Sequence, residues 1–200
     1  TTSSTPCTFK NMNYGIYVRN GQADVYNCSF ENIYASTHFF DYTSAVYLDN
    51  ACTYCNTVRK LSVGNSNANS SNIFDQCQVG VLTKGEVDAE ILSNDFTCTL
   101  SSFPYRFYNI LFSHSTGVRA LNVSSNNFSS YRIGILTDRV DQASLLIQYN
   151  NFSSDFILPV YNPFSLTGIY ISKKIGITVI GFNTFNDSRI CIYMNGVEGS

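Results

Sequence analysis

Two short sequence patterns alternate along the whole chain, and this repetition constrains the fold more than any other feature. The first is a small residue followed by β-forming residues, as in Gly15-Ile16-Tyr17-Val18. It recurs from Ala45, Gly80, Asn109, Gly134, Gly168 and Cys191. The second pattern ends in phenylalanine and has cysteine or asparagine two positions earlier. Its copies are Cys7/Phe9, Cys28/Phe30, Asn72/Phe74, Asn94/Phe96, Asn126/Phe128, Asn150/Phe152 and Asn183/Phe185.

The spacing of these repeats predicts a solenoid. From Phe9 to Phe185 the mean period is about 29 residues, which is typical of stacked repeat architectures. Each repeat holds three short β-forming runs separated by Gly, Asn or Ser, and no run has the length or period of a helix. Three strands per turn describe an all-β parallel β-helix of about seven coils. A β-branched residue stands five positions before five of the phenylalanines, at Val25, Ile91, Val123, Ile147 and Ile180.

The residue two before each phenylalanine has a predicted structural role. A buried turn between strands favours a side chain that tolerates left-handed geometry and whose amide can bond to the neighbouring turn. Stacked asparagines would therefore form a ladder from Asn72 to Asn183. In the first two coils Cys7 and Cys28 replace asparagine, and a stack of reduced thiols is favoured over a disulfide because neighbouring parallel strands hold Cβ atoms too far apart.

These motifs resemble those of the right-handed parallel β-helix proteins, a group that includes pectate lyases, polygalacturonases, phage tailspikes and surface adhesins. The resemblance covers nearly the whole chain, from Cys7 to Met194. It implies a right-handed, pectate-lyase-like solenoid, whereas the repeats themselves leave handedness open. The fold hosts many activities, so function has to be argued from the loops.

Short and long loops alternate between the phenylalanine and the next small residue, which makes two coils the true repeating unit. A single β-helical domain over residues 1–200 is expected, as a fragment of a longer chain with a loop insertion at 49–71. That insertion carries Cys52 and Cys55, for which a loop-stapling disulfide is favoured over a metal or redox site. Whether Cys7 and Cys28 are bridged stays open at this point.

The three long loops are unusually aromatic for exposed connections. If they share one edge of the solenoid, they form a ridge that could pack against another copy of the chain or stack on sugar rings. The opposing hypothesis is that the loops fold back over an outward apolar face of the sheet beneath. The candidate ridge residues are Phe39, Phe40, Tyr42, Phe103, Tyr105, Tyr108, Phe156, Tyr161 and Phe164.

No catalytic constellation emerges from the sequence. Glu86, Asp88 and Glu90 alternate and could share a face as a Ca²⁺ site, but a solvated turn is the favoured interpretation. Asp138, Arg139 and Asp141 occupy the matching turn two coils later and suggest surface pairing. Neither histidine is adjacent to a carboxylate, and the double-Asp, Gly-His-Gly and Arg-x-Lys motifs of polygalacturonases are absent. We therefore expect no enzyme and no resident cofactor.

Charge and composition narrow the classes of molecule that the chain could bind. The formal net charge is −2 and cationic residues are scattered, which argues against a nucleic-acid or anionic-membrane surface. No apolar run reaches membrane-spanning length. With 22 Asn, 25 Ser and 16 Thr the polar surface is largely neutral. The chain resembles segments of large bacterial adhesins and appendage proteins.

The favoured hypothesis is a structural or adhesive segment of a secreted, cell-surface protein. It would act as a stiff scaffold that contacts sister chains or neighbouring domains through the aromatic ridge. Two alternatives stay open: a polysaccharide lyase or glycosidase, and a carbohydrate-binding module that contacts surface glycans.

Overall fold

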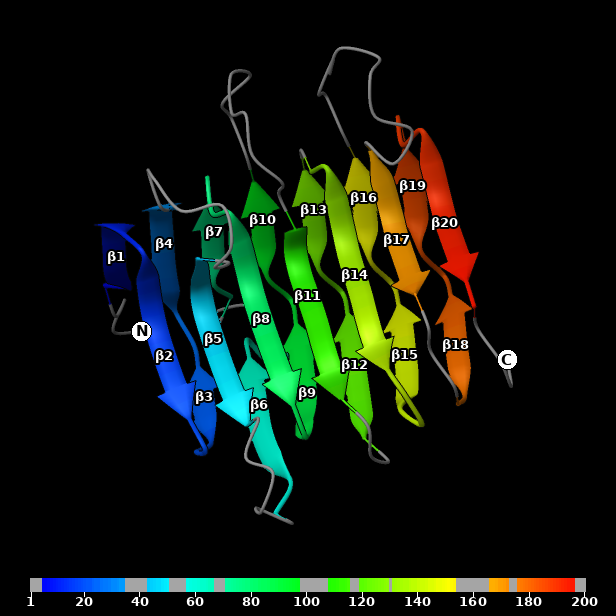
Figure 1. The fold of residues 1–200 in the computed structure, drawn as a ribbon. Helices are drawn as coiled ribbons and strands as arrows, with labels where there is room; N and C mark the ends of the chain where they lie inside the picture. Colours follow the sequence, from blue (N-terminus) through cyan, green and yellow to red (C-terminus); the bar gives the residue numbers. More distant parts are fainter. Residues whose placement is uncertain are drawn as a thin grey trace.

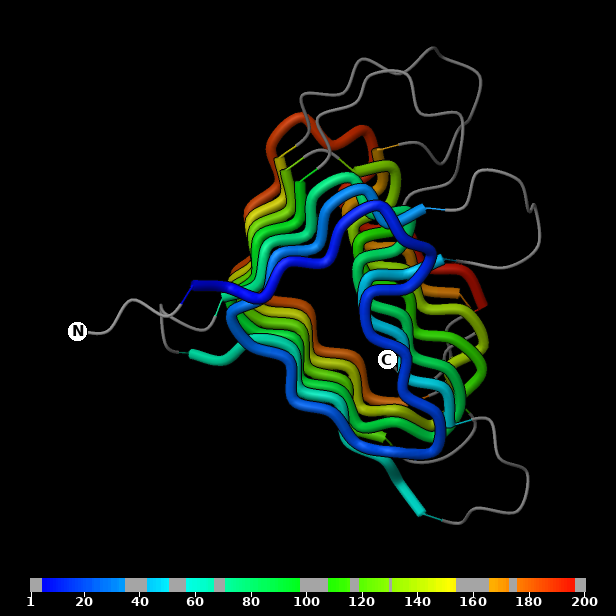
Figure 2. Tube along the Cα trace, turned by 90° about the vertical axis from the view of Figure 1, so that its left-hand side faces the viewer, coloured from blue at the N-terminus to red at the C-terminus, as the bar shows by residue number. Residues whose placement is uncertain are grey.

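The β-forming runs of each repeat build one turn of a parallel β-helix, as the sequence patterns predict, and the helix is right-handed. In this computed structural model all the elements are strands, and consecutive strands pass in turn through three parallel sheets (Figure 1). Viewed from the amino-terminal end, the chain runs clockwise as it recedes, which defines the right hand (Figure 2). The residues that the structure describes are 5–34, 43–50, 57–66, 71–97, 108–115, 119–129, 131–153, 166–172 and 176–196.

Two of the sheets collect one strand from each of the seven coils, and the third collects one strand from each of the first six. Sheet A holds β1 (Cys7–Met12), β4 (Cys28–Ile33), β7 (Ile73–Asp75), β10 (Asp95–Thr97), β13 (Asn127–Ser129), β16 (Asn151–Ser153) and β19 (Thr184–Asn186). Sheet B holds β2 (Tyr14–Arg19), β5 (Ser44–Asn50), β8 (Val79–Gly85), β11 (Tyr108–Ser115), β14 (Ile133–Val140), β17 (Thr167–Ser172) and β20 (Ile190–Asn195). Sheet C holds β3 (Ala23–Val25), β6 (Arg59–Val63), β9 (Val87–Leu92), β12 (Ala120–Ser124), β15 (Ser144–Gln148) and β18 (Thr178–Gly181). The expected seven coils are confirmed.

The seven phenylalanines of the second pattern form one continuous stack inside sheet A. Each lies opposite the next in register, from Phe9 to Phe185. Their ring centroids are 4.6–5.0 Å apart and their planes deviate by 6–13°. The spacing follows from the distance between neighbouring strands, so the sheet itself sets the stacking geometry. From Phe30 to Phe152 the side chains are at most 1% exposed.

The small residue that opens the first pattern leaves room for this stack. An added Cβ on Gly15, Gly80, Gly134 or Gly168 would lie 2.6–2.7 Å from a ring carbon of the next coil's phenylalanine. The same Cβ would lie 2.6–2.9 Å from a carbonyl oxygen of the following strand. Both distances are below ordinary contact, so glycine at these positions has a steric cause.

An inward row of β-branched residues lines sheet C. Val25, Val63 and Ile91 pair in register, and the row continues through Val123, Ile147 and Ile180. The sequence pattern does not identify Val63 as a member of this row, because extra residues separate it from Phe74. Strand β6 lies within the predicted insertion at 49–71, so the added residues fall on both sides of a strand.

The asparagines form a hydrogen-bonded ladder at the turn from sheet C to sheet A. Asn72, Asn94, Asn126 and Asn150 are at most 2% exposed. Each donates one amide hydrogen to Oδ1 of the next asparagine, at 2.8–3.1 Å, and the other to a sheet C carbonyl, at 2.8–2.9 Å. Asn183 receives the last of these bonds and donates to the carbonyl of Ile147. The buried amides are thereby satisfied without water.

The left-handed backbone position lies one residue earlier than the sequence pattern predicts. The ladder asparagines have ordinary φ angles, and positive φ belongs to Asn27, Ser93, Ser125, Tyr149 and Phe182, each directly before a ladder residue. This geometry turns the chain, whereas the following side chain faces inward and bonds along the axis. The ladder residue is therefore selected for its amide and not for its φ.

The two cysteines at the start of the ladder are free thiols that face each other in register. Cys28 Sγ donates to the carbonyl of Tyr26 at 3.3 Å, and its backbone N–H donates to Asn72 Oδ1 at 3.0 Å. Burial, with a smaller contribution from Cys7, raises the pKa of the Cys28 thiol. Cys52 and Cys55 lie outside the described residues.

Candidate functional site

The outer face of sheet B carries an apolar layer that is separate from the core. Val79, Leu82, Tyr108, Leu111 and Ile133 form a second hydrophobic cluster in which each side chain is at most 7% exposed. These residues come from two outward rows of β8, β11 and β14, which pair in register. Sheet B therefore has apolar side chains on both faces.

Tyrosines extend this outer layer toward both ends of the stack. In the second outward row Tyr17 and Tyr47 occupy the first two coils, leucines occupy the middle three, and Tyr170 and Tyr193 occupy the last two. The ring centroids of Tyr17 and Tyr47 are 5.1 Å apart, and those of Tyr170 and Tyr193 are 4.9 Å apart.

Tyr14 adds a third ring at the amino-terminal end. Its centroid lies 5.8 Å from that of Tyr17 and 6.1 Å from that of Tyr47. Tyr14 is 38% exposed and Tyr17 is 50% exposed, so this end of the layer is open to solvent. We call Tyr14, Tyr17, Tyr47, Tyr170 and Tyr193, with the leucines between them, the outer aromatic strip of sheet B.

The predicted loop ridge falls largely outside the described residues. Only Tyr108 of its members is described, and it opens β11 and is 5% exposed within the outer cluster. The opposing hypothesis requires an outward apolar face on the sheet, and the outer face of sheet B is apolar, with central side chains at most 7% exposed. The segments that would cover it lie outside the described residues, as do Phe39, Phe40, Tyr42, Phe103, Tyr105, Phe156, Tyr161 and Phe164.

The outer aromatic strip was not recognised as a surface in the sequence, although its signal is present there. The third residue of the small-Ile-x-Val pattern is Tyr17, Tyr47, Tyr170 or Tyr193 in four of the coils. Strand alternation places that residue on the face opposite the core. Tyrosines in a β-strand are common, whereas aromatic residues in long loops are unusual, so the loops give the stronger signal in the sequence.

A charged row flanks the strip. Arg19, Asp49 and Lys84 pair in register along sheet B, so opposite charges alternate over three coils. Tyr17 Oη donates to Asp49 Oδ2 at 3.5 Å, which connects the strip to this row. Asp49 thus lies between two cationic residues, and the row carries a net charge of +1 over these three coils.

The acidic cluster lies at the edge and outer face of sheet C, and its members have different partners. Glu86 is ion-paired with Arg119, and Glu90 with Lys60 at 2.9 Å. Asp88 Oδ1 accepts the backbone N–H of Ala120 at 2.9 Å. Each carboxylate thus contacts a neighbouring coil, and no group of three metal-binding side chains occurs among the described residues.

The second acidic turn places Arg139 against a histidine. His114 Nδ1 lies 2.5 Å from Ser113 Oγ, and Nε2 lies 3.3 Å from Arg139 Nη1. Arginine can only donate, so Nε2 accepts and neutral His114 carries its proton on Nδ1, directed at the serine. In this tautomer the ring cannot take the serine proton, which is the step a nucleophilic serine requires.

No protein-family model, no curated protein and no solved structure matches this chain. Among the described residues none forms a helix that could cross a membrane. Function is therefore inferred from the chemistry of the surface.

Proposed function

We propose that this chain is a stiff structural segment of an extracellular surface protein or filamentous appendage, which contacts sister chains through the outer aromatic strip of sheet B. The exposed amino-terminal end of the strip, with Tyr14 at 38% and Tyr17 at 50%, is the observation that carries the proposal, because the centre of the outer layer is at most 7% exposed. Clusters of exposed aromatic residues are common where proteins associate. Tyrosine suits such a contact because it buries a large area while keeping a polar end.

Stiffness is supported by the continuity of the stack. Sheets A and B run through all seven coils without interruption, and the phenylalanine and asparagine ladders follow the same axis. Each coil contacts its neighbours through backbone bonds in three sheets, so bending would have to open several ladders together. Such a segment suits the transmission of force or the spacing of other domains.

A surface location is supported by composition. Only 13% of the residues are charged, and neutral Asn, Ser and Thr supply most of the polar surface. Adhesive and appendage proteins of bacterial surfaces, which the repeats resemble, are rich in the same residues.

The experiment that tests the proposal is sedimentation velocity combined with electron microscopy of the purified chain. We expect elongated multimers whose mass rises with protein concentration. The double variant Tyr14→Ser/Tyr17→Ser should weaken association, because both side chains are exposed on the strip. Tyr26→Ser is the matched control, since Tyr26 is 41% exposed on a different corner. A concentration-independent monomer would contradict the proposal, as would equal loss of association in the control.

A further inference from the structure

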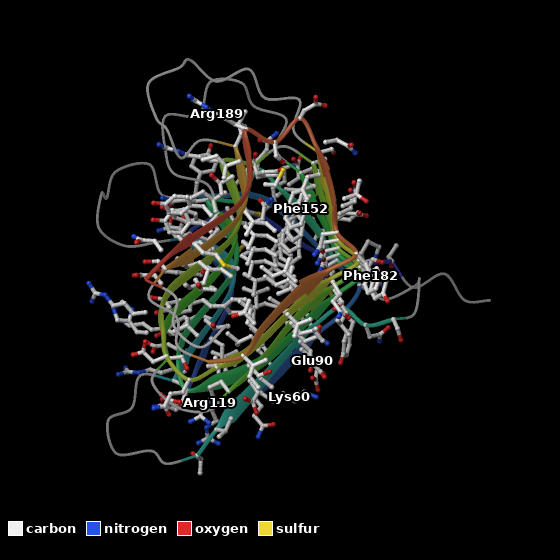
Figure 3. The ribbon with its side chains drawn as sticks, turned by 90° about the vertical axis from the view of Figure 1, so that its right-hand side faces the viewer. Lys60, Glu90, Arg119, Phe152, Phe182 and Arg189 are labelled. Atoms are coloured by element: carbon white, nitrogen blue, oxygen red, sulfur yellow. The ribbon has the colours of Figure 1, made fainter. Side chains whose placement is uncertain are left out.

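The corner between sheets C and A lies on the opposite side of the solenoid from sheet B (Figure 2), and the exposed Phe182 projects from it (Figure 3). Tyr149 follows β15 and Phe182 follows β18, at equivalent turns of neighbouring coils. Phe182 is 75% exposed and Tyr149 is 58% exposed. Their ring centroids are 5.0 Å apart and the planes differ by 5°, so the rings stack face to face and expose their edges and outer faces.

The backbone of this pair is unfavourable for aromatic residues. Tyr149 and Phe182 both have φ of 55°, in the left-handed region where bulky side chains are rare. Earlier coils place Asn27, Ser93 and Ser125 at this position, and small polar residues suit it better. Two neighbouring coils depart from this rule in the same way, and the rings gain little burial in return. Backbone strain of this kind is concentrated at functional sites.

The surroundings of the pair are uncharged. Residues 143–153 and 176–186, which form both turns and their flanking strands, contain no Asp, Glu, Lys or Arg. Binding of a phosphate, a nucleic acid or an anionic lipid depends on clustered cations, which these segments lack. The chemistry of the corner therefore favours a neutral ligand.

Polar and apolar groups lie on the two sides of the rings. On the sheet A side, Asn151 and Thr184 are exposed two residues after Tyr149 and Phe182, and Asn151 Nδ2 donates to Asn127 Oδ1 at 3.0 Å. On the sheet C side, Val179 is 45% exposed on β18. An aromatic surface beside amide and hydroxyl groups matches a sugar ring, which has apolar C–H faces and hydroxyl edges.

We propose that Tyr149 and Phe182 form a binding site for a neutral glycan. The C–H face of a sugar ring packs on the exposed aromatic surface, and Asn151 and Thr184 hydrogen-bond its hydroxyl groups. The site does not rest on lateral association through sheet B, because it lies on another side of the solenoid. It gives an adhesive scaffold a place to hold an uncharged polysaccharide.

The test is affinity electrophoresis in gels that contain a soluble neutral polysaccharide, with mannan, xylan and mixed-linkage β-glucan as the probes. We expect at least one of them to retard the wild-type chain. The double variant Tyr149→Asn/Phe182→Asn should bind that probe at least tenfold more weakly. Asparagine is the natural residue at this position in the first coil, so the variant keeps the turn geometry.

Three controls separate glycan binding at this pair from binding elsewhere on the chain, from charge attraction and from loss of folding. Tyr26→Asn changes an exposed aromatic residue at another turn and should leave retardation unchanged. Polygalacturonate, which is anionic, should retard the wild type less than the neutral probes. The melting temperature of the double variant should equal or exceed that of the wild type, because left-handed strain is relieved.

Several outcomes would overturn the glycan site. These are no retardation of the wild type by any neutral probe, or equal retardation of wild type and double variant. A lower melting temperature of the double variant would show that the rings stabilise the fold instead. Concentration-dependent association abolished by the double variant, without glycan binding, would make the pair a contact between copies.

Discussion

Asn94 donates its side-chain amide to Oδ1 of Asn126 across 3.0 Å, although the two residues are 32 positions apart in the sequence. The same Oδ1 accepts the backbone N–H of Asn94 at 3.0 Å, and the second amide hydrogen of Asn94 goes to the carbonyl of Val63 at 2.9 Å. One asparagine side chain therefore connects three successive coils. Repetition of this unit holds the coils in register at the corner where the chain enters sheet A.

Replacement of Asn126 by alanine should destabilise the chain by about 2–4 kcal/mol, because it removes an acceptor and a donor inside a buried network. The backbone and side-chain N–H groups of Asn94, the carbonyl of Ile91 and Oδ1 of Asn150 each lose a partner. Urea unfolding followed by far-ultraviolet circular dichroism gives the change in unfolding free energy. Asn122→Ala is the control, since that side chain is on the outer face and, among the described residues, accepts from Ser124 Oγ. Equal effects at the two positions would contradict the ladder's role.

The sequence predicts this ladder well because its cause is local and repeated. An inward asparagine at a fixed offset from an inward phenylalanine recurs in five coils, and stacking brings the copies together without further information. The φ assignment was wrong for a different reason. Asparagine is suited both to an inward hydrogen-bonding position and to a left-handed turn, so the sequence does not show which of the two roles Asn150 has. The left-handed φ belongs instead to the preceding residue, Tyr149.

Gly134 should not accept a side chain. An alanine Cβ there would lie 2.7 Å from a ring carbon of Phe152 and 2.6 Å from the carbonyl oxygen of Gly168, and the latter is backbone that cannot rotate away. We expect Gly134→Ala to destabilise the chain by about 1–3 kcal/mol, the usual range for overpacking. Differential scanning calorimetry of Gly134→Ala and Gly181→Ala makes the comparison, because a Cβ on Gly181 meets no atom within 4 Å. A melting temperature for Gly134→Ala equal to that of wild type would contradict this prediction, because it would show that the neighbouring strand and ring move to accept the methyl group at little cost.

The ion pair between Glu86 and Arg119 should matter more than that between Glu90 and Lys60. The Arg119 and Glu86 side chains are 15% and 22% exposed, whereas those of Lys60 and Glu90 are 53% and 47% exposed. Arg119→Met leaves a partly buried carboxylate without its cation and should cost about 1–3 kcal/mol. Lys60→Met should change stability little, because water screens the exposed pair. Chemical denaturation of both variants in low and high salt provides the test, and a larger loss at Lys60 would contradict it.

The candidate surfaces were harder to predict than the core. The acidic residues Glu86, Asp88 and Glu90 alternate in sequence, but the first two find partners at the start of β12 and the third finds one on β6, and those partners depend on the register of the sheets. The exposure of Phe182 depends on where the turn directs its side chain, and its sequence neighbourhood resembles that of any other coil. Inward residues repeat because every coil packs against another coil. Outward residues are determined instead by the molecules that the surface contacts, and the sequence does not identify these.

Alkaline pH should weaken the fold through Tyr131, which lies at the turn from sheet A to sheet B in the fifth coil. Burial, reinforced by the nearby Cys191 and Asp187, raises the pKa of its phenol to about 12, although a hydrogen bond with Ser188 Oγ acts in the opposite direction. Between the ordinary pKa of about 10 and this value, the unfolded chain ionises Tyr131 and the folded chain does not. The contribution of Tyr131 is therefore complete below pH 10 and is lost as pH rises toward 12.

Tyr131→Phe isolates this contribution. The variant keeps the perpendicular ring contact with Phe152, whose centroid is 5.9 Å away, and loses the bond to Ser188. At pH 8 it should be less stable than wild type by about 1 kcal/mol, the typical net value of one hydrogen bond. Above pH 10 the wild type alone loses stability at this residue, so the difference should narrow and vanish or reverse by about pH 12. Urea unfolding from pH 8 to pH 12 measures both curves, and the other tyrosines cancel because the two chains share them. Parallel curves over the whole range would show that Tyr131 ionises equally in the folded and unfolded chains.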